Sequence, residues 1–256
     1  MESYSPDKLR NVALLGHYGS GKTTLSEAMA FKSGIIKRLG SVGEGTSTSD
    51  YDPSEIERHM SLNLALLPLE WKGHKINVLD TPGYLDFSGE VRAALRVVDA
   101  AVVVVCASSS VEVGTEQYWS FARESGLPAM VVINKMDREN ADFAKTLGDI
   151  QSRLSNRCVA IQMPVGSQSE FRGYVDLVTM RAYIQDVEQD IPAELKDEAL
   201  ALRDKLVEVV VEIDDDLMNK YLEGTELTTA EIADAVRRAT AAGVAVPVVV
   251  SSAVKG

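Results

Sequence analysis

The chain has 256 residues, enough for one large domain or for one domain with a sizeable insert. Apolar residues make up 45% and charged residues 25%, close to globular averages, which excludes disordered, collagen-like and coiled-coil chains. The net charge of −12 is concentrated in residues 186–234, which hold 16 acids and 4 bases. Nucleic-acid binding by this fragment alone is therefore not expected. The acids indicate a partner surface or a solvated face.

Short β-rich runs alternate with helical patterns over residues 1–160, as a parallel sheet with crossover helices requires. The second and third runs flank Lys72-Gly73, a hairpin turn, so they should be antiparallel neighbours. The predicted strands are Asn11–Leu15, Leu64–Glu70, Lys75–Asp80, Ala100–Cys106, Ala129–Asn134 and Pro247–Ser251. The predicted helices are Lys22–Ser33, Ser88–Val97, Gly114–Ser125 and Asn140–Ser155.

The pattern changes after about residue 162. Two short β-like pieces, Phe171–Leu177 and Ala182–Asp186, precede helices. One helix is predicted from apolar residues that recur every three or four positions from Leu195 to Ile213, with acids opposite. Another, Thr229–Ala241, begins like a capping box.

A core strand returns only at Pro247, which indicates an insertion. We therefore expect an α/β domain with a doubly wound, mostly parallel sheet over residues 1–162 plus 243–256. Residues 163–242 should form an inserted, acidic α+β subdomain.

Cysteine usage and hydropathy limit the possible compartments. Cys106 and Cys158 form no CxxC pair, so neither a disulfide framework nor a zinc site is predicted, and Cys106 should be a buried core residue. The longest apolar run, Ala100–Ala107, is far shorter than a membrane span. The N-terminus lacks the apolar stretch of a signal peptide. A cytoplasmic protein without membrane association is expected.

The segment G-H-Y-G-S-G-K-T after the first predicted strand fits GxxxxGK[ST], and a helix follows it. That setting is typical of a phosphate-binding loop and not of a chance glycine-rich turn. Its backbone N–H groups would surround phosphates, Lys22 would pair with β- and γ-oxygens, and the Thr23 hydroxyl would bind Mg²⁺. The predicted phosphate-binding residues are Gly16, His17, Tyr18, Gly19, Ser20, Gly21, Lys22, Thr23 and Thr24.

The tetrapeptide Asp80-Thr-Pro-Gly83 ends the third predicted strand. An acid there faces the ligand crevice of a parallel sheet, so Asp80 would hold Mg²⁺ through water and the Gly83 N–H would reach the γ-phosphate. Such a D-x-x-G sequence is also a common turn at the end of a strand. Its spacing after Lys22 favours the functional interpretation.

Asn134-Lys-Met-Asp137 ends the next-to-last predicted core strand. The Asp137 carboxylate can accept from the guanine ring N–H and amino group, which adenine lacks at those positions. Asn134 would bridge loops and base, and the stem of Lys135 would lie on the base. Backbone N–H groups of Ser251, Ser252 and Ala253 would complete the pocket. GTP or GDP with Mg²⁺ is therefore predicted; an ATPase of the same loop family is the rival interpretation.

These motifs, in this order, resemble the N-terminal GTPase domain of a translational GTPase, in particular elongation factor G and its paralogues. Insert segments such as Gly173-Tyr-Val-Asp176 and Asn219-Lys-Tyr-Leu-Glu-Gly224 narrow the resemblance. It implies GTP hydrolysis coupled to ribosome movement or recycling, with the ribosome as activator and partner. Relatives continue past this position, so we expect the chain to be a fragment that lacks further C-terminal domains.

Three positions depart from that family. Gly19 replaces an aspartate to which a monovalent-cation contact is attributed. The end of the first switch, usually R-G-I-T, is Arg58-His59-Met60-Ser61, where Ser61 keeps a hydroxyl for Mg²⁺. Tyr84 stands where the family has its catalytic histidine.

A phenol at position 84 can orient water by hydrogen bonding but cannot become a cation. With Lys22 and Gly83, Tyr84 completes the predicted catalytic set. The alternative is an aromatic side chain packed beside Phe87 in a guanine-nucleotide switch with negligible turnover.

The remaining features are the first switch, for which one behaviour is expected, and two features that stay open to two interpretations each. The first switch, Gly40–Ser61, is rich in Gly, Ser and Thr and should be mobile until a γ-phosphate orders it. Arg58 is either an arginine finger or a surface charge on that switch. The acidic face of residues 194–213 is either solvated or, by resemblance, a docking site for ribosomal stalk proteins.

Overall fold

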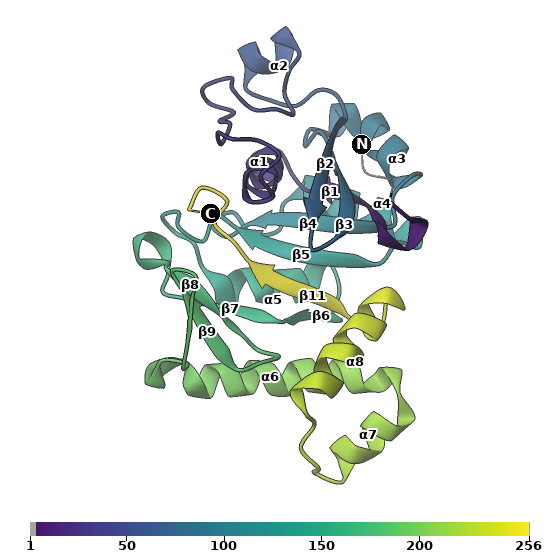
Figure 1. Ribbon diagram of the computed structural model, residues 1–256, viewed down its shortest axis with the longest axis vertical. Helices are drawn as coiled ribbons and strands as arrows, with labels where there is room; N and C mark the ends of the chain where they lie inside the picture. Colours follow the sequence, from purple (N-terminus) through teal and green to yellow (C-terminus); the bar gives the residue numbers. More distant parts are fainter. Residues whose placement is uncertain (1–3, 256) are drawn as a thin grey trace. The chain divides into compact units, whose positions relative to one another are not determined.

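The computed structural model describes residues 4–255 (Figure 1). Residues 1–3 and 256, which the expected GTP-binding domain includes, lie outside the described part. The described chain forms two compact units. Unit 1 comprises residues up to 106, 112–127 and from 252 onward, and unit 2 comprises residues 107–111 and 128–251.

Unit 1 contains four strands of the main sheet in the order β2-β3-β1-β4. β1 is parallel to β3 and to β4, and β2 is antiparallel to β3. Lys72 and Gly73 both have positive φ, 46° and 75°, as the predicted tight hairpin turn requires. The bounds lie within two residues of the prediction: β1 (Leu9–Leu15), β2 (Ala65–Trp71), β3 (His74–Asp80) and β4 (Ala100–Cys106).

The helices of unit 1 cover both faces of these strands (Figure 1). On one face, Leu14 of β1 and Val78 of β3 pack with Ala30 of α1. Side chains alternate between faces along a strand, so Ala13 and Leu15 point to the other face, where α3 and α4 pack on β1. The helices are α1 (Lys22–Lys32), α3 (Ser88–Leu95) and α4 (Val113–Glu124).

The connections of unit 1 explain where a ligand site arises. The connection from β1 leads through α1 to β2 and β3 on one side of β1, whereas the connection from β3 leads through α3 to β4 on the other side. Right-handed crossovers in opposite directions place their helices on opposite faces. The carboxyl end of β1 is therefore a topological switch point, where such sheets bind ligands.

The first switch contains a helix that composition did not predict, α2 (Pro53–Arg58). Asp52 caps it, Pro53 occupies its first turn, and Glu55 completes a capping box with Asp52. The signal is present in the sequence as D-P-x-E, but the surrounding Gly, Ser and Thr residues favoured a loop. The segment thus has regular structure in its second half.

Unit 2 contributes three parallel strands in the order β5-β11-β6, so that the main sheet has seven strands and is mostly parallel. The predicted α/β fold class is confirmed. β5 (Ala129–Asn134) matches its prediction, β11 (Val246–Val250) begins one residue early, and β6 (Cys158–Ala160) was too short to predict. α5 (Phe143–Arg153) and α6 (Lys196–Val210) pack on β6, and α8 (Thr229–Ala241) packs on β11.

A second, antiparallel sheet in unit 2 has the order β10-β9-β8-β7. The sequence predicted its two inner strands and missed the outer ones and α7. The compact units divide the chain elsewhere, so a separate subdomain over residues 163–242 stays a prediction. The elements are β7 (Gln162–Val165), β8 (Gly173–Asp176), β9 (Arg181–Ile184), β10 (Val187–Gln189) and α7 (Asp215–Leu222).

None of the helices among residues 4–255 has the length and apolar content needed to cross a bilayer.

Candidate functional site

The predicted phosphate loop connects β1 to α1, and its backbone conformation depends on glycine. Gly16, Gly19 and Gly21 all have positive φ, at 144°, 77° and 95°. A Cβ on Gly16 would lie 2.3 Å from the carbonyl oxygen of Val104, so a side chain there is excluded. The loop therefore turns tightly over the end of the sheet, with Ser20 buried.

Lys22 lies buried across this loop. Its Nζ donates to the carbonyl oxygens of Gly16, at 2.9 Å, and His17, at 3.1 Å. Gly83 lies beside it, because a Cβ on Gly83 would be 2.7 Å from Lys22 Nζ and from Tyr18 Cα. The structure thus brings together the loop, its lysine and Gly83, which belongs to the segment of residues 80–90 that we call the second switch.

Hydroxyl and carboxylate oxygens gather beside the loop, in the first turn of α1. Thr23 Oγ1 lies 3.2 Å from Ser61 Oγ, and Thr24 follows half-buried in the same turn. Asp80 is fully buried; Ser26 Oγ donates to its Oδ2 at 3.5 Å, and its Oδ1 has no hydrogen-bond partner among the described residues. The three predicted metal ligands therefore lie in one oxygen-rich cluster.

The charge state of Asp80 reflects this setting. Burial raises the pKa of Asp80 to about 6, against the opposing effects of the Thr23 hydroxyl and the Lys22 charge. A buried carboxylate oxygen without a partner fits a cation nearby. An all-oxygen donor set suits Mg²⁺, which binds one or two protein groups and completes its shell with phosphate and water. No cluster of three or more His, Cys, Asp or Glu that could hold another metal occurs among residues 4–255.

Asp50 belongs to the same cluster, and the sequence analysis did not identify it. Its Oδ1 accepts a hydrogen bond from Ser61 Oγ at 2.7 Å, and its Oδ2 is buried with no partner among the described residues. Burial raises the pKa of Asp50, and its charge also raises the pKa of Asp80. Asp50 directs the Ser61 hydroxyl; only its position before the D-P-x-E cap could have indicated it.

Tyr84 directly follows Gly83 and is held at two points. Tyr118 Oη donates to the Tyr84 carbonyl oxygen at 2.8 Å. The Tyr84 ring lies against Tyr18, with ring centroids 4.2 Å apart, and not simply beside Phe87 as the packing alternative expected. Arg58 is exposed at the end of α2.

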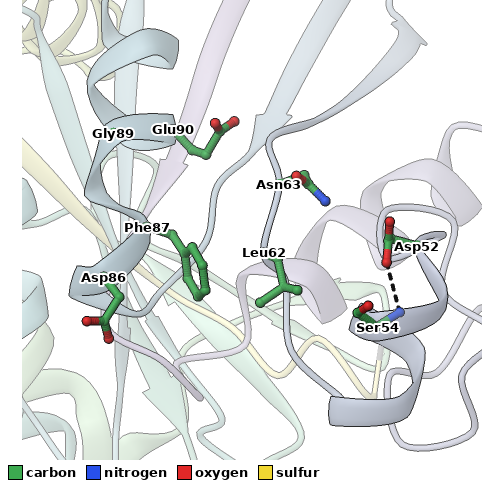
Figure 2. Close-up of a pocket in the computed structure, with 8 residues that line it drawn as sticks. All are labelled: Asp52, Ser54, Leu62, Asn63, Asp86, Phe87, Gly89 and Glu90. Carbon is green, nitrogen blue, oxygen red and sulfur yellow. Dashed lines mark hydrogen bonds between the residues drawn. The ribbon is translucent and has the colours of Figure 1, made fainter.

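A pocket of about 510 Å³ lies between α2 and the beginning of α3 (Figure 2). Figure 2 shows carboxylates from both switch segments around it, together with Leu62 and Phe87; the dashed line marks the cap bond from Ser54 N to Asp52. None of the predicted nucleotide residues lines this pocket. Its lining comes from residues 52–63 on one side and residues 86–90 on the other.

The predicted guanine-binding residues of unit 2 lie on two adjacent loops. Ser251 N donates to Ile133 O at 2.8 Å, and Met136 N donates to Ser251 O at 3.2 Å, so the loops after β5 and β11 are bonded together. Asn134 is fully buried, and Lys135 has a left-handed backbone, with φ 63°.

The other members of this group occupy the same two loops. Asp137 is half-buried after Lys135, and Ser252 and Ala253 follow Ser251 in buried positions. Within unit 2, the NKMD segment thus lies beside Ser251.

Comparison with known proteins agrees with this geometry. The family described as the elongation factor Tu GTP binding domain matches residues 7–256. A crystal structure of a protein from Thermus thermophilus is similar, with a TM-score of 0.90 and 39% sequence identity over 96% of this chain. The chain spans only 38% of the length of that protein. With its phosphate loop, hydroxyl-carboxylate cluster and NKMD loop in place, the chain belongs to the elongation factor Tu GTP-binding domain family: it is a GTP-binding translational GTPase domain of the elongation factor G type, as its motifs implied.

Proposed function

We propose that this domain hydrolyses GTP to GDP and phosphate by in-line attack of water, within a ribosome-associated factor that acts in translocation or recycling. The observation that carries the proposal is the cluster of Lys22, Gly83 and the oxygen atoms of Thr23, Ser61 and Asp80 at the end of β1 and β3.

The phosphate loop would bind the phosphates through backbone N–H groups from Gly16 to Thr24. Lys22 Nζ, which now bonds to two carbonyl oxygens of the loop, is placed to pair with β- and γ-oxygens. The Gly83 N–H would donate to the γ-phosphate. Gly19 leaves the loop without the carboxylate to which a monovalent cation would bind.

Thr23 and Ser61 would bind Mg²⁺ directly and Asp80 would hold it through water, with Asp50 orienting the Ser61 hydroxyl. Bound there, the ion would supply positive charge to the β- and γ-phosphate oxygens. The unpartnered Oδ1 of Asp80 supports this assignment.

Tyr84 would orient the attacking water through its hydroxyl. Burial raises the pKa of Tyr84, so the phenol stays neutral near pH 7 and acts as a hydrogen-bonding group only. Hydrolysis should therefore be slow until a partner closes the switches, and we propose the ribosome as that activator.

Asn134, Lys135 and Asp137, with Ser251, Ser252 and Ala253, would read guanine. Membership in a GTP-binding family favours this over the ATPase alternative. Asp137→Asn should weaken guanine-nucleotide affinity by about 100-fold or more and favour xanthine nucleotides, because the amide presents a donor to a donor. A competition titration measures it, and unchanged guanine preference would remove Asp137 from this role.

The acidic face of residues 194–213 supports ribosomal stalk proteins as further partners of the factor, which we place in the cytoplasm, where ribosomes work. No role for this chain alone in nucleic-acid binding is proposed, because its net charge is −12.

Single-turnover phosphate release by the full-length protein, with and without ribosomes, tests the proposal. Tyr84→Phe should lower the ribosome-stimulated rate by about 10- to 100-fold with unchanged nucleotide affinity, and Tyr84→His should retain activity. Tyr221→Phe, in the exposed part of α7, is the matched control. If Tyr84→Phe hydrolyses GTP like wild type, Tyr84 is a packing residue; if no variant or wild type turns over, the chain is a binding switch.

A further inference from the structure

The side chain of Tyr18 in the phosphate loop lies against the side chain of Tyr84 in the second switch. Their ring centroids are 4.2 Å apart, and the ring planes are inclined by 32°. Tyr18 is 41% exposed, so it is not a core residue. An aromatic contact at this separation is attractive and restrains both rings.

The backbone beneath the two rings is fixed by other contacts. A Cβ on Gly83 would lie 2.7 Å from the N and Cα atoms of Tyr18, so the two segments touch directly. On the other side, the buried Tyr118 donates its hydroxyl to the Tyr84 carbonyl oxygen at 2.8 Å. Since these contacts hold the backbone of Tyr84, the direction of its side chain is what remains to be set.

Burial raises the pKa of Tyr84, and the adjacent Tyr18 side chain adds to that effect. Tyr18 therefore contacts Tyr84 through its ring, while its backbone belongs to the phosphate loop.

We infer that Tyr18 is a positioning residue for GTP hydrolysis, which sets the direction in which Tyr84 presents its hydroxyl. The inference rests on the proposed role of Tyr84 and extends it to a side chain that no motif identifies. The Tyr18 ring acts through Tyr84 alone, whereas its backbone N–H serves the phosphates. Replacing the side chain should therefore change the hydrolysis rate and leave nucleotide affinity intact.

The kinetic test compares Tyr18→Ala and Tyr18→Phe in the full-length protein, in single-turnover hydrolysis with ribosomes and saturating GTP. Tyr18→Ala should lower the rate by about 10-fold or more, since a misplaced catalytic group costs up to about 100-fold. Tyr18→Phe keeps the ring and should retain most of the rate. The dissociation constant for GDP should stay within about 2-fold of wild type in both.

A double-mutant cycle then assigns the effect to the pair. In a Tyr84→Ala background, Tyr18→Ala should cause no further loss of rate, because the group that it positions is absent. Tyr221→Ala is the matched control. The exposed fraction of Tyr221, 38%, is similar to the 41% of Tyr18, and Tyr221 lies in unit 2. An equal loss in both backgrounds would overturn the inference, and so would a parallel loss of GDP affinity.

A measurement without catalysis separates the two proposals. With 3-fluorotyrosine at position 84, Tyr18→Phe should shift the ¹⁹F resonance and lower the pKa of that phenol, because the Tyr18 hydroxyl that raises this pKa is lost. An unchanged titration in Tyr18→Phe and Tyr18→Ala overturns the inference whatever Tyr84 does. If the titration changes but Tyr84 variants hydrolyse GTP at the wild-type rate, the proposed catalytic role of Tyr84 is overturned, and the positioning role of Tyr18 with it.

Discussion

The acids that bind the first switch and the acids of residues 186–234 have different partners. Glu27 of α1 and Glu55 of the first switch are buried, and their carboxylates accept hydrogen bonds from backbone N–H groups. In the acid-rich stretch, Glu231 and Asp214 lie nearer the surface, where they cap helices and pair with Lys220 and Arg238.

The comparison teaches that net charge indicates little about which acids hold the molecule together. A buried carboxylate that satisfies backbone donors leaves them unpaired when it is removed. An exposed pair is screened by water and salt, and its loss costs little. Glu27 and Glu55, which satisfy such backbone donors, both lie outside residues 186–234, in the part of the chain where acids and bases are equal in number.

The largest effect is expected for Glu55→Ala. Glu55 Oε1 accepts from Leu62 N and Asn63 N, both at 2.9 Å, directly after Ser61. Removing it leaves buried donors unpaired and should lower the free energy of unfolding by about 3 kcal/mol in urea denaturation. Glu57→Ala, exposed on the same helix, should have little effect. Equal stability of the two variants would contradict the comparison.

Glu27→Ala should have a smaller and more local effect. Glu27 accepts from Gly40 N at 3.1 Å and from Thr48 N at 2.5 Å, which fastens the first half of the switch to α1. Amide hydrogen exchange should quicken over residues 40–48 while the sheet stays protected. The exposed Glu44→Ala is the control. Exchange that stays slow across this segment would show that other contacts hold it.

Asp214→Ala tests a half-buried acid that also caps a helix. Its Oδ1 accepts from Asp216 N and Leu217 N, and its Oδ2 pairs with Arg238 at 2.9 Å. Loss of the cap should lower the melting temperature, but by less than Glu55→Ala does. A larger fall than that of Glu55→Ala would reverse the proposed ranking.

The smallest effect is expected from the pair of Glu231 and Lys220, and it should disappear in acid. The hydrogen bond from Lys220 lowers the pKa of Glu231 to about 2, below its usual 4.5. A depressed pKa means that the pair stabilises the fold above about pH 4.5 and loses this effect as the pH falls toward 2. Glu231→Gln should lower the free energy of unfolding slightly at pH 7, and its difference from wild type should shrink as the pH falls from 4.5 toward 2, which flattens the stability profile over that range. A difference from wild type that appears only below about pH 2 would have the wrong sign.

Local patterns predicted most of the fold. The run of valines in β4 and the turn at Lys72-Gly73 are short-range signals, and the strands formed almost where expected. The phosphate loop and NKMD segment were recognisable for the same reason, because each function is carried by consecutive residues.

The parts that the sequence did not reveal depend on contacts between distant segments. Glu27 looks like any helical acid until the loop at residues 40–48 folds over it. Asp50 acquires its role only when Ser61 is brought beside it. Tyr18 occupies a variable position of the loop pattern, and its contact with Tyr84 exists only in the folded chain.

The close approach of Gly83 to Lys22 and Tyr18 leaves no room there for even a methyl group. A single added carbon at that point would act as a wedge that keeps the second switch from seating on the phosphate loop. We therefore expect a side chain at position 83 to separate nucleotide binding, which depends on the phosphate loop, from hydrolysis, which depends on both segments.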